Sequence, residues 1–453
     1  MRVLLIWPRN ERASLNDDMS CCEPLGLEYL AGALRAHHDV EILDERLDPP
    51  LEEWAADREP PDVVGVAIPF TASIRPSRRA SRIARAIWPS AVIVLGGHHP
   101  TVSSEWMDGF DADWVVAGEG GPSFCTLLEA IERRVQPPDI AGLARYGARD
   151  EIRRGATPAP DALQSLPMPD RTITARHRAS YFHSIYQPVS LIRFSTGCPF
   201  HCNFCSLWRI TERRYLVKEE ERVIDELQAI DGENVYVVDD EAFIQPARML
   251  ALADAIDDAG LRKRYHMYVR TDTALRRQDV MERWAELGLD SVLVGAESMT
   301  DGELAGYQKG TTAQQTQEAI ELFHRYGVKV RANFIVDPAW GEDGFDRLER
   351  TIAELGVDLP SFSVLTPLPG TNLFDEIRDQ IVTDDPDMFD LWHSVLSTRL
   401  APERFHERLA GLFVLASGRS SDASSAVFYY GNDGAFERMI RSIRDGWDRS
   451  LLR

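Results

Sequence analysis

Residues 195–208 read STGCPFHCNFCSLW and place three of the chain's six cysteines, Cys198, Cys202 and Cys205, within eight positions. Thiolates are soft ligands that suit zinc and iron–sulfur centres. A structural zinc site, the alternative here, needs a fourth ligand, and no cysteine follows Cys205. His201 lies inside the group but too close to its neighbours for zinc-finger spacing. Three thiolates on one loop instead suit three irons of a 4Fe–4S cluster, which leaves the fourth iron open to a substrate or cofactor.

The segment around this loop reads as a series of βα units. Short apolar strand candidates alternate with helix candidates, which is typical of a parallel sheet covered by helices. The pattern predicts a partial (β/α)6 barrel, with a second doubly wound sheet as the alternative. The cysteines directly follow the first strand, at the face where barrel enzymes place their chemistry. The strand candidates are residues 190–195, 234–239, 265–269, 291–296, 330–336 and 361–366, and the helix candidates are residues 219–229, 247–259, 279–287, 312–326 and 344–355.

The first 145 residues also alternate between strands and helices. Their strands are apolar throughout, which indicates burial on both faces and predicts a doubly wound parallel sheet. The runs GGHHP (residues 96–100) and GEGG (residues 118–121) follow strand ends, where open α/β sheets bind ligands. The predicted strands are residues 3–7, 40–44, 63–68, 92–97 and 114–121, with helices over residues 26–37, 77–87 and 123–133.

These patterns divide the α/β chain into residues 1–145, a linker over residues 146–190, the barrel over residues 191–385, and a helical region over residues 386–453. The linker is rich in proline and charge, so we expect it to lie over a surface. The last segment predicts a helix packed on the barrel, with a membrane-surface helix as the alternative because arginines line its other face. Its apolar residues at helical spacing are Phe436, Met439, Ile440, Ile443, Trp447 and Leu451.

Composition narrows the function classes. The 453 residues suffice for two or three domains, and 72 acidic against 50 basic residues give a formal net charge of −22. So strong a negative charge argues against nucleic-acid binding and favours small-molecule substrates. We find no signal peptide and no apolar run of the about 20 residues that span a bilayer. We therefore expect a cytoplasmic protein without a transmembrane segment, in which clustered cysteines bind metal or do chemistry.

The spacing C-x3-C-x2-C, with Phe204 just before the last cysteine, resembles the radical S-adenosylmethionine superfamily. The resemblance implies that Cys198, Cys202 and Cys205 are the catalytic ligands of a 4Fe–4S cluster whose open iron binds S-adenosylmethionine. Electron transfer would then cleave the sulfonium and release a 5′-deoxyadenosyl radical. Phe204 is implied to lie against the bound S-adenosylmethionine.

Polar residues at the ends of barrel strands carry further implications of this resemblance. Asp239 and Asp240 end one strand, and Asp240 is the one implied to approach the cofactor or substrate. The strict glycine-glycine-glutamate form of this motif is absent. Arg270 is implied to hold the methionyl carboxylate, and Glu297 and Asn333 to contact the ribose. A salt bridge or a cap at the barrel end is the alternative for each of them.

The run EPLGLEYLAGALR, continued through VEILD, PDVVGVAI, VIVLGGHHPT and WVVAGEG, resembles cobalamin-binding domains fused to radical S-adenosylmethionine enzymes. In that family the corrin lies across strand ends and its nucleotide tail enters the domain. Gly96 and Gly97 match the glycine pair that lets the tail approach the backbone, and Thr71 and Ser73 match small polar residues beside the tail. The residues implied to bind cobalamin are Phe70, Thr71, Ser73, Gly96, Gly97, His98, Glu119 and Gly120.

Two common motifs are missing from this N-terminal part. A G-x-G-x-x-G run does not follow the first strand, so the dinucleotide fingerprint fails. The D-x-H-x-x-G cobalt-ligand motif is also absent, and no histidine precedes His37. The resemblance therefore implies a cobalt without a protein histidine below it, with Phe70 or Thr71 near that face. We expect His98 and His99 to line the tail pocket or cap the next helix, with cobalt ligation as the alternative.

The overall match is closest to the hopanoid C-3 methylase branch, and it runs from EPLGLE through CSLW, VDDEAFI, DPAW and TPLPGT to MFDLWHSVLSTRL, about residues 1–410. It implies a methyltransferase that moves a methyl group from methylcobalamin to an unactivated carbon of a small molecule. An electron donor such as flavodoxin or ferredoxin is also implied. Alternatives are a cyclase or rearrangement enzyme without methyl transfer, and a non-catalytic cobalamin or iron–sulfur sensor.

The same branch implies an apolar polycyclic substrate, while a polar substrate remains open. The aromatic residues that would line an apolar pocket are Trp208, Trp340, Phe345 and Trp392.

Overall fold

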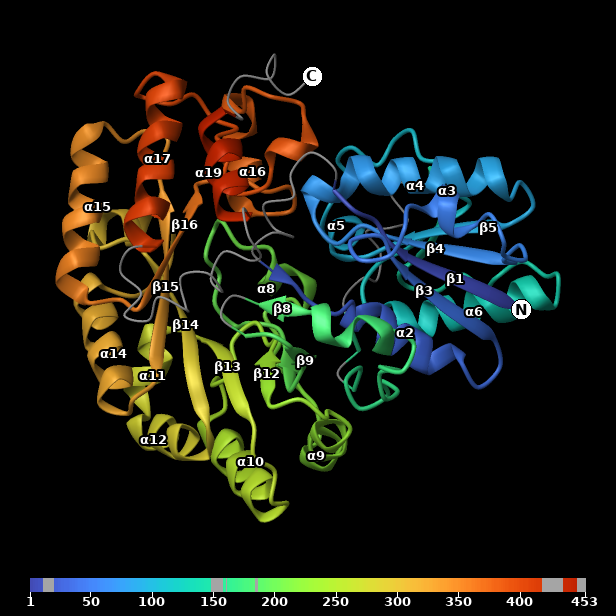
Figure 1. Ribbon diagram of the computed structural model, residues 1–453, viewed down its shortest axis with the longest axis horizontal. Coiled ribbons are helices and arrows are strands. Elements are labelled where there is room, and N and C mark those ends of the chain that lie inside the picture. The colour runs from blue at the N-terminus through green and yellow to red at the C-terminus, as the bar shows by residue number, and fades with distance from the viewer. Residues whose placement is uncertain (11–19, 148–157, 160, 184–185, 418–434, 446–453) are drawn as a thin grey trace.

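Two six-stranded sheets organise the chain, one in its N-terminal part and the other in its C-terminal part. The computed structural model describes residues 1–10, 20–147, 158–159, 161–183, 186–417 and 435–445. Figure 1 shows the two sheets in separate lobes, the first in blue and the second in green to orange. The α/β architecture expected from the sequence is confirmed.

The N-terminal sheet has the strand order β3 (Asp39–Asp44), β1 (Arg2–Trp7), β4 (Val63–Ala67), β5 (Val92–Gly96), β6 (Trp114–Val116) and β7 (Leu143–Arg145). Helices α2 (Leu25–Leu34) and α6 (Gly120–Glu132) pack on one face, and α3 (Leu51–Trp54) and α4 (Ile74–Ile87) pack on the other. The order in which strands are added reverses between β1 and β4. The carboxyl ends of these strands are therefore the switch point of a doubly wound sheet, where such folds bind ligands.

Two features of this sheet differ from the sequence prediction. Strand β6 ends at Val116 rather than at residue 121, because the GEGG run turns the chain and α6 begins at Gly120. Strand β7 then pairs with β6 in the antiparallel direction, so the sheet is not wholly parallel. Three residues are too short a run for an apolar pattern to reveal this strand.

The second sheet is parallel and has the order β16 (Leu359–Val364), β15 (Lys329–Val336), β14 (Leu289–Glu297), β13 (Arg264–Val269), β12 (Asn234–Val237) and β9 (Ser190–Ile192). Each strand lies beside the next one along the chain, which is the arrangement of a barrel and excludes a second doubly wound sheet. The helices that connect the strands lie along the outer rim of this sheet (Figure 1). They are α9 (Glu220–Gln228), α10 (Pro246–Asp258), α11 (Thr271–Arg276), α12 (Gln278–Leu287), α13 (Asp301–Gly306), α14 (Ala313–Arg325) and α15 (Glu342–Leu355).

The segment predicted as a linker that lies over a surface has several buried anchors among its described residues. Tyr181 is fully buried, and strand β8 (Phe182–His183) pairs with β2 (Ser20–Cys21). Leu163 and Leu166 form a small apolar cluster with Leu216. Proline and charge thus marked irregular backbone, and the segment lies on the two sheets' lobes through these buried anchors while other residues, such as Met168, are exposed. Residues 148–157, 160, 184 and 185 of this segment lie outside the described residues.

A buried charge cluster joins the two lobes. Glu226 on α9 accepts hydrogen bonds from Tyr29 on α2 at 2.9 Å, from Lys218 at 2.5 Å and from Arg171 at 2.9 Å. Arg171 also pairs with Glu23, which accepts a hydrogen bond from the backbone N–H of Leu191 in β9. Because Glu226 and Lys218 are each 2 % exposed or less, these charges interact without much screening by water.

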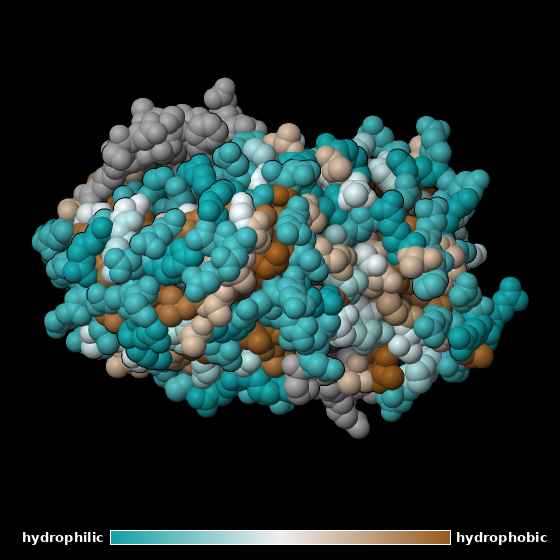
Figure 2. Space-filling view, turned by 90° about the horizontal axis from the view of Figure 1, so that it is seen from below, coloured by the Kyte–Doolittle hydropathy of each residue, from teal (hydrophilic) through white to brown (hydrophobic). Residues whose placement is uncertain are grey.

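The C-terminal region contains α16 (Asn372–Ile377), α17 (Pro402–Ser417) and α19 (Ala435–Asp445), while residues 389–401 are irregular. Met439 and Ile443 on α19 are buried in the core that α17 and the barrel share. This supports the helix packed on the barrel rather than the membrane-surface helix. Trp447 and Leu451 lie outside the described residues. No helix in the described ranges is long and apolar enough to span a membrane, and the face in Figure 2 is mainly hydrophilic.

The buried charge cluster predicts a specific loss of stability. Glu226→Gln leaves Lys218 and Arg171 buried without their shared carboxylate, and we expect a loss of about 3–5 kcal/mol in the free energy of unfolding. Tyr29→Phe removes one hydroxyl and should cost only about 1 kcal/mol. Urea titration followed by circular dichroism measures both variants. A smaller loss for Glu226→Gln than for Tyr29→Phe would contradict the role given to this carboxylate.

Candidate active site between the two sheets

The cysteine loop begins at a glycine that no other residue can replace. Gly197 has a φ of +92°, and a Cβ atom on it would lie 2.1 Å from the carbonyl oxygen of Arg214. Its N–H donates a hydrogen bond of 2.6 Å to the carboxylate of Asp240 at the end of β12. On its other side the loop enters α8 (Leu207–Ile210). The loop is thus fixed to the carboxyl ends of the barrel strands, where the sequence placed it.

Hydrogen bonds fix the backbone of this loop, and burial affects its thiols. Cys202 is buried, and its carbonyl oxygen accepts hydrogen bonds from the N–H of Cys205 at 3.2 Å and from the indole of Trp208 at 3.1 Å. Burial raises the pKa of Cys198 to about 11 and that of Cys205 to about 12. Both are therefore protonated at neutral pH without a metal, and iron binding has to displace their protons.

The donor set fits an iron–sulfur cluster better than a single ion. The structure forms no disulfide among the six cysteines, all of which lie in the described ranges. Among the described residues, no three His, Cys, Asp or Glu side chains converge closely enough to hold one metal ion. Each thiolate of a 4Fe–4S cluster binds a different iron, so the sulfur atoms need not converge on one point.

Three consecutive acidic residues follow β12 and take different positions. Asp239 accepts hydrogen bonds from the N–H of Phe194 at 2.7 Å and from the Ser195 hydroxyl, and burial raises its pKa to about 6. Glu241 accepts the N–H of Arg270 at 2.6 Å, and burial raises its pKa to about 7. Asp240 alone of the three reaches the cavity described below. This supports the preference for Asp240 over Asp239 as the group near the cofactor.

Arg270 lies directly beside the cysteine loop. One of its guanidinium nitrogens is 3.7 Å from the sulfur of Cys202, and another donates to the carbonyl oxygen of Lys309 at 2.7 Å. Its guanidinium also stacks on the ring of Phe200 at 3.7 Å. A positive charge at this point stabilises an anionic cluster or carboxylate bound next to Cys202.

The remaining residues assigned to S-adenosylmethionine lie on the same end of the barrel. Glu297 has a φ of +58° and accepts a hydrogen bond of 2.7 Å from Lys309. Sequence reasoning did not single out Lys309. Asn333 donates to the Ser363 hydroxyl at 3.2 Å. The ring of Phe204 meets that of Tyr307 edge-on, with centroids 5.9 Å apart. The ribose and sulfonium contacts of these residues remain predictions.

A cavity of about 540 Å³ lies between the N-terminal sheet and the cysteine loop. Its wall is mainly apolar, and it includes glycines at the carboxyl ends of the strands. Gly97 has a φ of +128°, and a Cβ atom there would lie 2.6 Å from the carbonyl oxygen of Ile68. An apolar wall with glycine loops at the switch point suits a flat macrocycle whose substituents approach the backbone. Cobalamin therefore fits this cavity.

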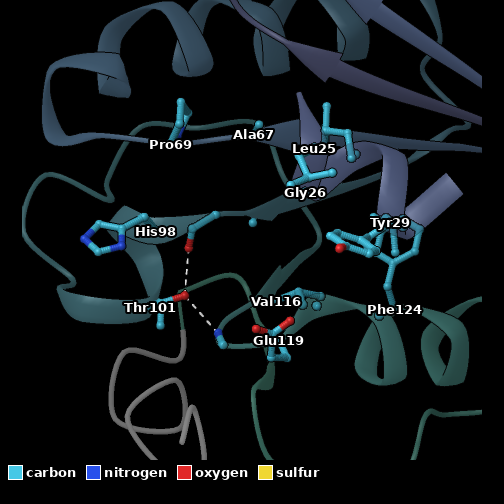
Figure 3. A pocket seen from close by; sticks show the side chains of 18 of the residues that line it. Leu25, Gly26, Tyr29, Ala67, Pro69, His98, Thr101, Val116, Glu119 and Phe124 are labelled. Carbon is cyan, nitrogen blue, oxygen red and sulfur yellow. Dashed lines mark hydrogen bonds between the residues drawn. The ribbon is translucent and has the colours of Figure 1, made fainter. Parts of the chain in front are cut away.

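The structure brings together most of the residues assigned to cobalamin. The members that line the cavity are Phe70, Gly96, Gly97, His98, Glu119 and Gly120, of which Figure 3 labels His98 and Glu119. Phe70 is 55 % exposed, which suits an apolar contact below a bound ring. The imidazole of His98 lies 3.2 Å from the Ser206 hydroxyl in the cysteine loop. The cavity and the cluster loop are therefore in direct contact.

Two of the assigned residues do not reach the cavity. Thr71 is buried with its hydroxyl 3.2 Å from His99, and the carbonyl oxygen of Ser73 accepts the Ser77 hydroxyl at 2.7 Å. Neither is part of the cavity wall. The imidazole of His99 is fully buried and lies 2.9 Å from the carbonyl oxygen of Glu105, which is a structural role. Thr71 is buried and Ser73 is partly buried in the short 3-10 helix after β4, and the contacts assigned to them beside the cobalamin tail remain predictions.

Thr101 on α5 (His98–Val102) was not singled out in the sequence. Its hydroxyl donates to the carbonyl oxygen of Gly97 at 2.7 Å and accepts the N–H of Gly118 at 2.8 Å, as the dashed lines in Figure 3 show. It thereby ties the two glycine loops together at the cavity wall. Arg193 was also missed, and it pairs with Glu119 at 2.7 Å across the two lobes.

Two family models match the chain. Residues 16–128 match the B12 binding domain, and residues 192–355 match the Radical SAM superfamily. The chain is 31 % identical over 399 residues to the hopanoid C-3 methylase of Methylococcus capsulatus, which covers 85 % of this chain and 75 % of that protein. It is 28 % identical over 409 residues to the anaerobic magnesium-protoporphyrin IX monomethyl ester cyclase of Rubrivivax gelatinosus, over 85 % of this chain and 71 % of that protein.

A solved structure shares the fold over the whole chain. The radical S-adenosylmethionine methyltransferase TsrM of Kitasatospora setae, bound to tryptophan and an S-adenosylmethionine analogue, superposes with a TM-score of 0.71. The alignment covers 99 % of both chains at 20 % identity. TsrM was also solved with cobalamin and a [4Fe–4S] cluster, and that structure gives a TM-score of 0.69.

Removal of a single thiol should show that iron–sulfur binding and cobalamin binding belong to different sites. Cys202→Ala is expected to abolish iron–sulfide absorbance after anaerobic reconstitution, because a cluster ligand is lost, while cobalamin retention stays near that of the unmodified protein. Cys125→Ala, on α6 and away from the loop, is the matched control and should keep both spectra. Iron and sulfide retained in Cys202→Ala would contradict the assignment.

Substitution of Gly121 tests whether the cavity binds cobalamin. It lines the cavity, and a Cβ atom on it would meet no atom within 4 Å, so a larger side chain fits without damage to the fold. Gly121→Phe should lower cobalamin uptake more than about tenfold, because the ring fills the space, whereas Gly121→Ala should bind normally. Visible absorbance of the desalted protein measures the uptake. Equal cobalamin content in the two variants would exclude this cavity as the corrin site.

Proposed function

The chain belongs to the cobalamin-dependent radical S-adenosylmethionine family that includes hopanoid C-3 methylase, and we propose that it transfers a methyl group to an unactivated carbon of a small molecule. Its cofactors are a 4Fe–4S cluster, S-adenosylmethionine and cobalamin. The observation that carries the proposal is the 3.2 Å contact between His98 at the cavity and Ser206 in the cysteine loop. A molecule at this junction can meet both cofactors at once.

When bound, the cluster supplies the electron that cleaves S-adenosylmethionine, and cobalamin supplies the transferred methyl group. The chain's own residues bind, orient and exclude water. Cys198, Cys202 and Cys205 hold the cluster, and Arg270 places positive charge beside it. The glycine loops at Gly97 and residues 118–121 let the corrin approach the backbone. The Arg193–Glu119 pair lines the cavity and joins the two lobes there.

Each part of the chain has its own proposed role. We assign cobalamin binding to residues 1–145, the cluster and S-adenosylmethionine to residues 191–385, the joining segment to residues 146–190 and a packed helical region to residues 386–453. An electron donor such as flavodoxin or ferredoxin has to reduce the cluster between turnovers. Reduced thiols and an iron–sulfur centre require a reducing compartment, which supports a cytoplasmic location.

Cyclisation without methyl transfer is the second candidate. It is supported by the 28 % identity to the protoporphyrin cyclase, a similarity that spans both matched domains. The two reactions share the fold and the cofactors, so the product has to separate them. A cyclase product loses hydrogen and gains no carbon, whereas a methylated product gains one carbon and two hydrogens.

Turnover with trideuteromethyl S-adenosylmethionine tests the proposed reaction. We expect a product that carries the CD3 group, together with S-adenosylhomocysteine and 5′-deoxyadenosine in equal amounts, since one molecule supplies the methyl group and a second is cleaved. Mass spectrometry of the quenched anaerobic reaction measures all three. A product without deuterium in which hydrogen has been lost would favour cyclisation. Intact S-adenosylmethionine in the fully reconstituted, reduced protein would instead indicate a sensor.

A further inference from the structure

The cavity between the lobes extends down the face of the N-terminal sheet. Leu5, Gly65 and Val94 line it, and the register places them side by side on β1, β4 and β5. Ala67 and Gly96 also line it and form the next level, at the carboxyl ends of β4 and β5. Because the two levels are two residues apart, this inner part of the cavity reaches about 7 Å below the strand ends.

Two helices cover this inner part, which we call the arm. Helices α2 and α6 pack on the same face of the sheet as Leu5 and Val94, and side chains from both helices reach the arm. Gly65 adds no side chain, and a Cβ atom there would lie 2.8 Å from Leu5 and 3.7 Å from Phe124. The arm therefore suits a small flat group and not a macrocycle with its side chains. Its lining residues are Leu5, Leu27, Leu30, Gly65, Val94 and Phe124.

The arm offers no hydrogen-bond partner to a ligand among these described residues, all of which are apolar. Figure 3 shows Tyr29 and Phe124 at one side of the cavity and His98 at the other. The Tyr29 hydroxyl is engaged, because it donates to Glu226 at 2.9 Å and accepts from Lys218 at 2.8 Å. Strands β1, β4 and β5 each pair on both sides, so their amide groups are used within the sheet. A polar atom that enters the arm thus loses water without replacement.

The polar side chains of the cavity stand at its mouth, around the strand ends and the cysteine loop. Trp7 ends β1, and the guanidinium of Arg46 lies 4.7 Å from the centre of its ring. Glu119 and Arg193 pair at 2.7 Å. The corrin ring carries carboxamide side chains around its rim, and such amides are donors and acceptors for groups of this kind. The polar lining residues at the mouth are Glu23, His98, Thr101, Glu119, Arg193, Thr196 and Asp240.

The aromatic residues expected to line an apolar substrate pocket lie elsewhere. Phe345 is fully buried, with its ring edge-on to Trp340 at 5.9 Å, and Trp392 belongs to the same core. The indole of Trp208 donates to the carbonyl oxygen of Cys202. None of these four aromatic residues lines the cavity. The apolar arm is therefore a separate feature from the expected substrate pocket.

Corrinoid cofactors differ from one another in the group that matches the arm. Each carries a nucleotide loop that ends in a lower base, which is 5,6-dimethylbenzimidazole in cobalamin and adenine in a common relative. Dimethylbenzimidazole is flat and bears two methyl groups. Adenine is of similar size but bears an amino group and two ring nitrogens that dimethylbenzimidazole lacks. The two cofactors thus differ in polarity at the base and share the corrin.

We infer that the arm binds the lower base of the corrinoid and selects dimethylbenzimidazole over adenine. The inference rests on the proposed function, in which a corrinoid is a cofactor, and it specifies which corrinoid this chain takes. Burial of the two methyl groups in the arm is favourable. The amino group of adenine would be buried there without a partner, which disfavours the purine.

Corrinoid binding tests the selection directly. The anaerobically prepared protein with its iron–sulfur cluster is dialysed to equilibrium against cobalamin, adeninylcobamide or cobinamide, which has no base, and visible absorbance gives the bound fraction. We expect a dissociation constant for adeninylcobamide about tenfold to a hundredfold above that for cobalamin. Cobinamide should also bind more weakly than cobalamin, because the arm stays empty. Equal constants for cobalamin and either probe, or tighter binding of either, would overturn the inference.

Cobalt coordination does not produce the expected order. Adenine leaves cobalt in water more readily than dimethylbenzimidazole does, so the cost of detaching the base favours adeninylcobamide. A preference for cobalamin therefore has to come from the protein.

Substitution of Leu30 tests whether the arm makes the selection. Leu30 on α2 is partly buried and lines the arm. Leu30→Gln brings an amide donor and acceptor into the arm, and should lower the ratio of the two dissociation constants about tenfold. Leu30→Met keeps the arm apolar at a similar volume and should preserve the ratio. Each ratio is measured within one protein, so a general loss of stability cancels. The same ratio in both variants would overturn the arm as the selecting site.

The same measurements separate failure of the inference from failure of the proposed function. Equal binding of all three corrinoids would overturn selection by the arm and leave cobalamin-dependent methyl transfer intact. Failure of every corrinoid to bind would remove this cofactor from the reaction, and would overturn the proposed function together with the inference.

Discussion

The arrangement of the two lobes depends on the hydrogen bonds and ion pairs of one buried residue, Glu226. Its carboxylate joins α2 of the N-terminal sheet, the segment around Arg171 and helix α9 of the barrel, at distances between 2.5 and 2.9 Å. Radical methyl transfer needs two large cofactors in a fixed relation, because a misplacement of about 1 Å can cost two orders of magnitude in rate. A buried charge cluster suits this task, since it penalises every arrangement in which one of its members is left alone.

The side chains around the site differ between its two sides. The wall toward the N-terminal sheet is apolar and rich in glycine, so a flat ring can approach the backbone closely. The cysteine loop carries Cys198 and Cys205, whose pKa burial has raised, so these two thiols stay protonated until iron binds. The apolar cavity wall and the cysteine loop thus lie side by side.

Local patterns located the elements well. The six barrel strands were found because their outward side chains, such as Val292 and Val294, are apolar with a period of two. The cysteine spacing located the cluster loop, and the glycine pair at Gly97 located one wall of the cavity. Thr71 and Ser73 lie outside the cavity wall, because the direction of a side chain after a strand end depends on the turn. Lys309 and Thr101 were missed because their roles arise from contacts across the fold.

The sequence by itself determined the order of the βα units, the place of the cysteine loop and the family, since these follow from spacing along the chain. Only the tertiary structure decided which carboxylate after β12 faces the cavity and which side chains of the proline-rich segment are buried. The physical reason is that burial and side-chain contacts are set by residues distant in the chain. Glu226 and Tyr29 are 197 residues apart, and no local pattern records that they meet.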